Sequence, residues 1–344
     1  MLFSKFIALV CPNGKDPAQK YAESLAQIEM ADEMGFYGIW LSENHFSCHT
    51  GLPQFQGEIG ITPKPLLFGM QIVERTRQIR VGTAVRNIVF THPLLVAEEA
   101  LVFDLLSKGR LDLGVGCGYR PWEFEGFRID RAEARERFLE SLEILDRGLR
   151  GETFSFQGKY YDIPEVSLVP KPYYTQPRPR LYLATGDMEQ IKLAARKDYG
   201  VMSFSTSSKE HLVALYNTYR DIAEPLGHDV SRTRFPVTRQ IYIHKDPAVV
   251  QEYAERNLPH YQAALGDFKT CPPLEELKKL YIIGTPEECV QQLQTLRDEM
   301  GCEHVILWFN FGWLTHQEVT EQMRLFAEEV MPCFQPEPKA IACP

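Results

Sequence analysis

The segment Leu41–Phe46 contains the side chains best suited to acid–base chemistry. Its sequence, LSENHF, places the carboxylate of Glu43, the amide of Asn44 and the imidazole of His45 directly after an apolar run. Among these groups only an imidazole exchanges protons readily near neutral pH. We therefore expect His45 to act as an acid or base, with Glu43 or Asn44 orienting it. A structural histidine, satisfied by neighbouring backbone groups, accounts equally well for the segment taken alone.

A second segment, GVGCGYR at residues 114–120, contains closely spaced glycines. Glycines let backbone N–H groups approach an anion, and Arg120 adds a charged donor. The segment does not match a dinucleotide-binding fingerprint, because a third glycine is missing at the spacing that this motif requires. A tight loop at the rim of a barrel would have the same composition.

Two further segments place small or hydroxyl-bearing residues where apolar runs end. Thr185 and Gly186 precede a helical segment that opens near Asp187, so a hydroxyl and free backbone N–H groups would be available to a phosphate. An ordinary helix N-cap accounts equally well for these residues. The segment Gly82–Asn87 is rich in small residues that would let a flat ring lie close to the backbone.

All these segments belong to an alternation of apolar, strand-forming runs with helix-period segments. This alternation predicts a parallel sheet covered by helices, and we expect an α/β fold with the architecture of a (β/α)8 TIM barrel. The active site of such a barrel lies at the carboxyl ends of its strands. The expected strands are Phe3–Val10, Tyr37–Glu43, Ile79–Val85, Arg110–Gly116, Arg180–Ala184, Gly200–Phe204, Phe235–His244 and Glu303–Phe309.

Residues typical of helix ends support this pattern. Pro17–Met34 has helical periodicity, and Gly35 is placed to end the helix. The segment Thr285–Glu288 has the pattern of an N-cap followed by a capping-box glutamate, and Gly301 ends the apolar stripe that follows. Thr315–Glu318 repeats the pattern before the last helix.

Two stretches interrupt the alternation and are expected to be insertions on the barrel. Thr153–Ile163 predicts a β-hairpin after the fourth strand, and Pro164–Pro179 predicts a proline-rich connection. Leu265–Leu280 lacks periodicity and lies near the seventh strand, where it would serve as a lid over the active site. We expect a single domain over residues 1–332 and a C-terminal tail over residues 333–344.

The composition limits the partners of the chain. A net charge of −9 opposes binding to nucleic acid and to anionic lipid. No stretch approaches the ~20 apolar residues of a membrane span, and the N-terminal apolar run is too short for a signal peptide, so we expect a cytoplasmic protein. The eight cysteines include no C-x-x-C pair. A metal site at His45, Cys48 and His49 would need further ligands, so we expect reduced thiols and no metal.

Taken together and in order, these segments resemble the bacterial-luciferase-like flavin-dependent monooxygenases. The resemblance is carried by AQIEMADEMGFYGIWLSENHF, by VGTAVRNIVFTHPLLVAEEALVFDLLSKGRLDLGVGCGY, by LYLATGD, and by IGTPEECVQQL through RLFAEEVMP, between Met1 and Pro332. It implies a barrel that binds reduced FMN noncovalently and oxygenates a small organic substrate with O2 through a C4a-hydroperoxyflavin. A separate flavin reductase as partner and a homodimer are also implied.

The resemblance also assigns residues to the cofactor, and it implies a non-proline cis peptide bond between Ala84 and Val85. The residues that it places along the flavin ring and its ribityl chain are Ala84, Val85, Asn87, Gly116, Cys117, Gly118, Tyr119 and Met202. Those that it places at the phosphate end are Thr185, Gly186 and Asp187, and Ala184 is also assigned to the cofactor.

Two positions depart from the family's pattern. The histidine that serves as base in light-emitting members matches Asn44 here, so light emission from a long-chain aldehyde is not expected. Many members have an arginine that supports the flavin phosphate where this chain has Cys117. Arg120 is the candidate substitute for that arginine, and weak flavin binding is the alternative. We interpret Cys117 as a small space-filling residue rather than a redox-active thiol.

Flavin oxygenation requires an active site that is closed to water. We expect Trp308, Phe309, Phe311 and Trp313, around the end of the last strand, to form walls on the substrate side, although an aromatic run is also typical of a barrel core. Two other functions stay open: a flavin- or deazaflavin-dependent dehydrogenase on the same fold, and a catalytically silent barrel subunit. The substrate does not follow from the sequence, because several loops shape the pocket.

Overall fold

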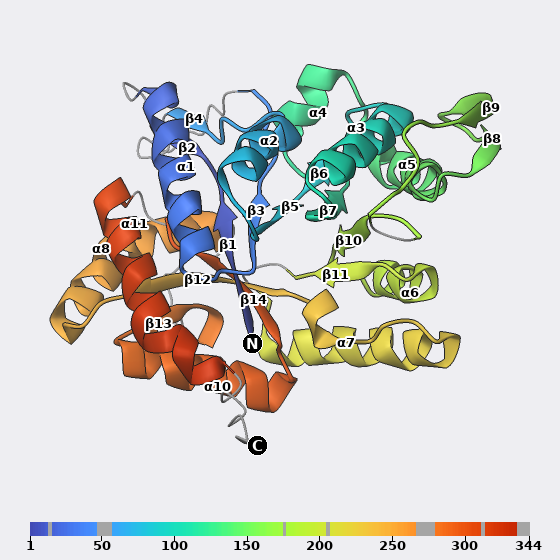
Figure 1. Cartoon of the computed structure of the whole chain (residues 1–344). Coiled ribbons are helices and arrows are strands. Elements are labelled where there is room, and N and C mark those ends of the chain that lie inside the picture. Colours follow the sequence, from blue (N-terminus) through green and yellow to red (C-terminus); the bar gives the residue numbers. More distant parts are fainter. Residues whose placement is uncertain are drawn as a thin grey trace, which may run out of the picture.

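A computed structural model describes residues 1–12, 16–46, 57–174, 177–203, 207–265, 279–310 and 314–335. In this part of the chain a ten-stranded sheet runs through the centre of the molecule, and helices cover its outer side (Figure 1). The strand order is β11-β10-β7-β5-β3-β1-β14-β12-β13, and β6 pairs with β7. The bounds are β1 (Leu2–Ile7), β3 (Gly38–Leu41), β5 (Arg80–Thr83), β6 (Arg86–Asn87), β7 (Leu111–Gly116), β10 (Arg180–Ala184), β11 (Gly200–Met202), β12 (Val237–Ile243), β13 (Ile282–Gly284) and β14 (His304–Trp308).

Neighbouring strands of this sheet are parallel. The strand path closes where the backbone N–H of Ser203, after β11, donates to the carbonyl of Pro236, before β12, at 3.3 Å. The predicted α/β barrel is confirmed, and each expected strand overlaps an observed one. The first strand is shorter than expected, because Val10 already belongs to β2 (Val10–Pro12), which pairs antiparallel with β4 (Gly57–Ile59). The short strands β6 and β13 were not predicted, since two or three residues show no periodicity.

The helix ends agree with their sequence signals. Gly35 follows the first helix, and Gly301 ends the helix that begins after Thr285, with a φ of +63° that favours glycine. Thr285 and Thr315 each form a capping box. The bounds are α1 (Pro17–Glu33), α2 (Pro65–Arg75), α3 (Pro93–Leu106), α4 (Pro121–Phe127), α5 (Ala134–Leu149), α6 (Met188–Lys197), α7 (Lys209–Ala223), α8 (Pro247–Leu265), α10 (Pro286–Met300) and α11 (His316–Leu325).

Replacing Thr285 by alanine is expected to lower the free energy of unfolding by about 1 kcal/mol. The Thr285 hydroxyl accepts from the Glu288 backbone N–H at 3.4 Å, and the Glu288 carboxylate accepts from the Thr285 N–H at 2.8 Å. Urea-induced unfolding measures the change. Thr295→Ala, in the middle of α10, is the matched control and should cost less than about 0.5 kcal/mol. Equal losses in the two variants would contradict the capping argument.

The predicted hairpin is confirmed and lies at the periphery, beyond α5 (Figure 1). It consists of β8 (Thr153–Gln157) and β9 (Asp162–Ser167). The second strand therefore includes Pro164, which the sequence analysis assigned to an irregular connection. A shift in register between Phe154 and Phe156 accommodates this proline, which cannot donate a ladder hydrogen bond. Of the predicted lid, Leu265 ends α8, and residues 266–278 lie outside the described residues.

Side chains of the strands alternate between the barrel interior and the surrounding helix layer. In the interior, the hydroxyl of Ser4 lies 2.8 Å from Nε2 of His304, and burial lowers the pKa of His304 to about 4. Trp40 and Tyr182 pack edge to face beside this pair, with ring centroids 5.2 Å apart. The buried carboxylate of Asp112 pairs with Arg80 at 2.8 Å near these rings, so the amino-terminal part of the barrel is filled by aromatic and paired polar side chains.

The described C-terminal residues pack onto the first strand. The ring of Phe334 lies 5.7 Å from that of Phe3, and the amino group of Met1 donates to the Phe334 carbonyl at 3.0 Å. The packed part of the chain thus extends beyond residue 332. Among the described helices, none combines the length and the apolar character needed to cross a bilayer.

Candidate active site

The carboxyl ends of neighbouring strands bring the predicted site residues together. Strands β3, β5, β7, β10 and β11 follow one another in the sheet (Figure 1). The segments at their carboxyl ends are residues 43–45, 84–87, 116–119, 184–187 and Met202. Because parallel strands end on the same side of a barrel, all the candidate residues lie at one mouth.

Glu43 holds the imidazole of His45. One oxygen of its buried carboxylate lies 2.9 Å from His45 Nε2, and the other accepts from the buried guanidinium of Arg86 at 2.6 Å. The backbone N–H of His45 donates to the carboxylate of Glu123 at 2.9 Å. Ring and backbone of His45 are thus held by different carboxylates. Of the two residues expected to orient His45, Glu43 makes this contact.

Asn44 is engaged elsewhere. Its amide nitrogen donates to the hydroxyl of Ser42 at 2.7 Å, and its amide oxygen accepts from Arg120. Arg120 also lies 3.6 Å from the carboxylate of Glu123 and 5.3 Å from the ring centroid of Tyr119. These contacts direct Arg120 toward Asn44, which does not favour the expected role of Arg120 at the flavin phosphate. Tyr119, expected along the flavin, is 69% exposed.

Aromatic rings surround the imidazole of His45. Phe127 and Phe90 both pack edge to face against it, with ring centroids 4.9 and 6.1 Å from the centroid of the imidazole. The two phenyl rings stack on each other, with their centroids 4.9 Å apart. The ring centroid of Phe46 lies 5.0 Å from that of Phe127. The acid–base candidate is therefore buried in an apolar wall. This wall was not predicted, because Phe90 and Phe127 lie far from His45 along the chain.

Ala84, Ala184 and Met202, which come from different strand ends, pack into one small cluster in the barrel interior. The other members of this cluster are Phe6, Trp40, Tyr182 and Ile306. Alanine side chains are short, and neither alanine nor methionine carries a strong hydrogen-bonding group. The mouth thus has a flat, apolar floor of the kind that an isoalloxazine ring requires.

The peptide bond between Ala84 and Val85 is cis, as the resemblance implied. A Cβ atom at Gly116 would lie only 2.7 Å from a methyl group of Val85, so this position requires glycine. Gly118 has a φ of +72° and packs against an aromatic ring. Asn87 is buried at the end of β6. Small residues therefore predominate where the neighbouring strands β5 and β7 end.

The expected phosphate end lies at the N-terminus of α6. The hydroxyl of Thr185 accepts from the backbone N–H of Asp187 at 3.0 Å, across Gly186. The carboxylate of Asp187 accepts from the N–H of Gln190 at 3.0 Å, so Asp187 is the N-cap of the helix. Arg135 of α5 lies 3.6 Å from the same carboxylate. The site therefore contains the hydroxyl, the helix N-terminus and a cation that anion binding requires.

Cys117 also has arginine neighbours. Burial raises the pKa of its thiol, and the positive charges of Arg135 and Arg131 oppose this rise. The raised pKa favours the unreactive thiol, in agreement with a space-filling role. Neither arginine was predicted, although the arginine-rich segment RAEARER at residues 131–137 was a usable signal.

The aromatic residues expected as substrate walls divide between two environments. Trp308 points into the barrel and packs against Phe6, with ring centroids 5.1 Å apart. Phe309 lies fully buried in the helix layer and packs against Phe326 at 5.7 Å. For Phe309 the role of a substrate wall is therefore wrong and the core alternative holds, because successive side chains of a strand point to opposite faces. The other expected wall residues, Phe311 and Trp313, and the metal candidates Cys48 and His49 lie outside the described residues.

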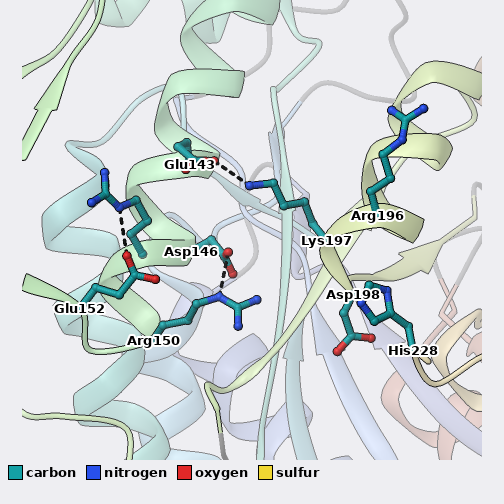
Figure 2. A pocket seen from close by; sticks show the side chains of 9 residues that line it. Glu143, Asp146, Arg150, Glu152, Arg196, Lys197, Asp198 and His228 are labelled. Carbon is teal, nitrogen blue, oxygen red and sulfur yellow. Dashed lines mark hydrogen bonds and ion pairs between the residues drawn. The ribbon is translucent and has the colours of Figure 1, made fainter. Parts of the chain in front are cut away.

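A polar pocket of about 380 Å³ lies where α5 and α6 end (Figure 2). Its lining residues are Glu143, Asp146, Arg147, Arg150, Glu152, Arg196, Lys197, Asp198 and His228. Figure 2 shows Lys197 directed at Glu143, 3.1 Å away, and Arg150 at Asp146, 3.0 Å away. Helices of a barrel run opposite to its strands, so this pocket lies at the amino ends of the strands, the end that serves stability. We interpret it as a salt-bridged structural surface.

A comparison with known families tests the resemblance noted in the sequence. The model of the luciferase-like monooxygenase family matches residues 1–304. This chain belongs to the luciferase-like monooxygenase family. The resemblance is thereby confirmed, and the enzyme class that it implied agrees with the relatives, which include a flavin-dependent monooxygenase.

Curated relatives include the oxygenase component of a flavin-dependent trigonelline monooxygenase from Acinetobacter baylyi. It is 24% identical and matches 97% of this luciferase-like chain and 96% of its own length. Uncharacterized protein y4wF of Sinorhizobium fredii is 35% identical over 57% of this chain, and the match spans only 54% of that relative.

Solved structures share the fold over nearly the whole chain. Monooxygenase RslO1 from Streptomyces bottropensis has a TM-score of 0.86 at 29% identity and covers 97% of this chain and 100% of its own. The oxygenating constituent of 3,6-diketocamphane monooxygenase from Pseudomonas putida, in complex with FMN, has a TM-score of 0.77 at 18% identity, covering 96% and 98%. An F420-dependent secondary alcohol dehydrogenase has a TM-score of 0.74 at 16% identity, covering 97% and 99%. The fold alone therefore accommodates different flavin cofactors.

Proposed function

We propose that this protein is the oxygenase component of a two-component monooxygenase, which uses reduced FMN and O2 to oxygenate a small organic substrate. One observation carries the proposal: His45, held by the buried carboxylate of Glu43, lies at the same mouth as the flat floor around Ala84 and Ala184. An acid–base group beside an apolar surface of this kind suits flavin oxygenation. The partner that supplies reduced FMN would be a separate flavin reductase, by analogy with the oxygenase component from Acinetobacter baylyi.

The residues at this mouth suit FMN. The floor around Ala84 and Met202 would support the ring, and Thr185, the N-terminus of α6 and Arg135 would hold the phosphate. Bound reduced flavin would supply the electrons that activate O2. The carboxylate of Asp187 is occupied as N-cap, so Arg135 also offsets a negative charge that would oppose the phosphate.

The side chains around His45 define which of its nitrogens reacts. An ionised carboxylate only accepts hydrogen bonds, so Nε2 of His45 carries the hydrogen that faces Glu43. Nδ1 is then the nitrogen that takes a proton from the substrate or returns it. Phe90 and Phe127 exclude water from this exchange.

The test is an anaerobic titration of the purified protein with reduced FMN, and with reduced F420 for comparison. We expect reduced FMN to bind and, after mixing with O2, to reoxidise more slowly than free reduced FMN. A panel of small ketones, phenols and N-heterocycles then identifies the substrate as the compound that replaces hydrogen peroxide release by oxygen incorporation. Binding of F420 in preference to FMN would favour a dehydrogenase, and no flavin binding would favour a silent subunit.

Replacing Arg135 by alanine is expected to weaken FMN binding about 10-fold, because a charge-assisted hydrogen bond to the phosphate is lost. Riboflavin lacks the phosphate, so its affinity should not change. Quenching of flavin fluorescence measures both affinities. Arg137→Ala, on the same helix but paired with Glu133 at 3.5 Å, is the matched control. An equal loss of affinity for FMN and riboflavin would place Arg135 elsewhere than at the phosphate.

We also propose that the protein forms a homodimer. Exposed apolar side chains gather on α2 and α3, which lie side by side (Figure 1). They are Leu67 on α2 and Leu95, Val102, Leu105 and Leu106 on α3. Scattered exposed apolar residues are ordinary, but a group on two adjacent helices is typical of an interaction surface. Light scattering should therefore give twice the chain mass of 39.5 kDa, and a monomer would contradict the proposal.

A further inference from the structure

The buried guanidinium of Arg86 lies directly behind the carboxylate that holds His45. We propose that Arg86 is a positioning residue, which offsets the charge of Glu43 and, through this carboxylate, holds the imidazole of His45 with its hydrogen on Nε2. The inference rests on the proposed function, in which His45 is the acid–base group, and it gives a role to Arg86, to which neither the sequence nor the resemblance assigned one.

Arg86, Glu43 and His45 form a continuous hydrogen-bonded chain. Arg86 belongs to the two-residue strand β6, where it pairs with Val115 of β7, and its side chain is 1% exposed. Its guanidinium donates to one oxygen of Glu43 at 2.6 Å, while the other oxygen lies 2.9 Å from Nε2 of His45. The backbone N–H of Asn87, the residue after Arg86, lies 3.4 Å from that second oxygen. Strand β6 therefore directs two donors at the carboxylate that holds the imidazole.

Stability does not account for this arrangement. A buried ion pair adds little stability compared with well-packed apolar residues. Within the described part of the chain, Nε of Arg86 has no hydrogen-bond partner. Its contacts with Thr91 and Glu99 are long, at 3.4 Å each. The short hydrogen bond of this arginine is the one to Glu43, which is the bond that the positioning role requires.

Two ion pairs lie around His45, and Glu99 adds a third carboxylate that shares Arg86 with Glu43. The charged groups that face this site are Glu43 after β3, Arg86 of β6, Glu123 of α4, Arg120 before α4 and, behind Arg86, Glu99 of α3. Arg86 offsets Glu43 at 2.6 Å, and Arg120 offsets Glu123 at 3.6 Å. Without Arg86, the carboxylate of Glu43 would face the imidazole uncompensated and would favour the imidazolium. Nδ1 would then carry a proton and could not accept one.

Nuclear magnetic resonance of the cofactor-free protein, labelled with ¹⁵N-histidine, tests this role directly. The signals of His45 are those that disappear in His45→Gln. In Arg86→Gln we expect the midpoint of the His45 titration to rise by about one pH unit or more, a roughly 10-fold higher proton affinity. In Glu43→Gln, which leaves the charge of Arg86 uncompensated, we expect the midpoint to fall and the single Nε2–H tautomer to be lost.

Arg75→Gln is the matched control, because it removes one guanidinium from a surface pair with Glu29 at 2.9 Å. A His45 titration and tautomer that are unchanged in folded Arg86→Gln would overturn the proposal. If Arg86→Gln does not fold, Arg86→Met replaces it, because methionine fills the buried position with an apolar side chain and also removes the charge behind Glu43. Arg86→Met must then raise the midpoint, and an unchanged midpoint would overturn the proposal.

These readings need neither flavin nor substrate. A shifted titration in a protein that fails to bind reduced FMN would uphold the role of Arg86 and reject the proposed function. Normal oxygenation by the native protein, together with an unshifted His45 titration in Arg86→Gln, would uphold the proposed function and reject the role of Arg86.

Discussion

Replacing His45 by alanine is expected to lower kcat for substrate oxygenation by about 10²- to 10⁴-fold, the usual contribution of a positioned acid or base. The loss should fall on kcat, because the flat floor around Ala84 and Met202 is separate from the imidazole and continues to bind the flavin. The measurement is the rate of oxygen incorporation from isotope-labelled O2 into the substrate found in the panel. Hydrogen peroxide release, measured in parallel, should rise as substrate oxygenation falls.

His211→Ala is the control for this prediction, since His211 is exposed on α7. It should retain full kcat and full coupling of O2 to product. A kcat for His45→Ala within about twofold of the native value would show that another group moves the proton, and the assignment of His45 would be withdrawn.

Replacing Lys5 by methionine is expected to stabilise the protein by roughly 5 kcal/mol below pH 7. Lys5 lies on β1 but points into the helix layer, with its Nζ 5.3 Å from the ring centroid of Phe309. It is buried, and among the described residues its Nζ has no hydrogen-bond partner. Burial lowers the pKa of Lys5 from 10.5 to about 7. Folding therefore costs free energy, either to bury the charged ammonium group of Lys5 or to remove its proton.

The stabilisation by Lys5→Met depends on pH in a defined direction. Because the pKa of Lys5 is lower in the folded state, the cost is complete below about pH 7 and disappears as the pH rises toward 10.5. At pH 9 the advantage should have fallen to roughly 2 kcal/mol. Urea-induced unfolding at pH 6 and pH 9 measures it, with Lys64→Met, at an exposed position, as control. A gain that is equal at both pH values would reject burial of the ammonium group as the cause.

Signals that act over a few residues were readable in the sequence. The capping boxes at Thr285 and Thr315 and the helix end at Gly301 were predicted correctly, because their hydrogen bonds join residues at most six positions apart. The barrel followed from the alternation of strands and helices, since parallel strands joined by helices have few arrangements. The segment Leu41–Phe46 indicated the acid–base candidate, because few side chains titrate near neutral pH.

Contacts between distant segments were decided by the tertiary structure. Glu43 and Arg86 are 43 positions apart, and only the pairing of β6 with β7 brings this arginine behind the carboxylate. Arg120 points toward Asn44 rather than toward the phosphate end, where Arg135 of α5 lies instead. Strand register and helix packing determine which side chains meet across a barrel, and a shift by one residue would turn each of them to the opposite face. The sequence thus specified the elements and the kind of chemistry, whereas packing selected the partners of the reacting histidine.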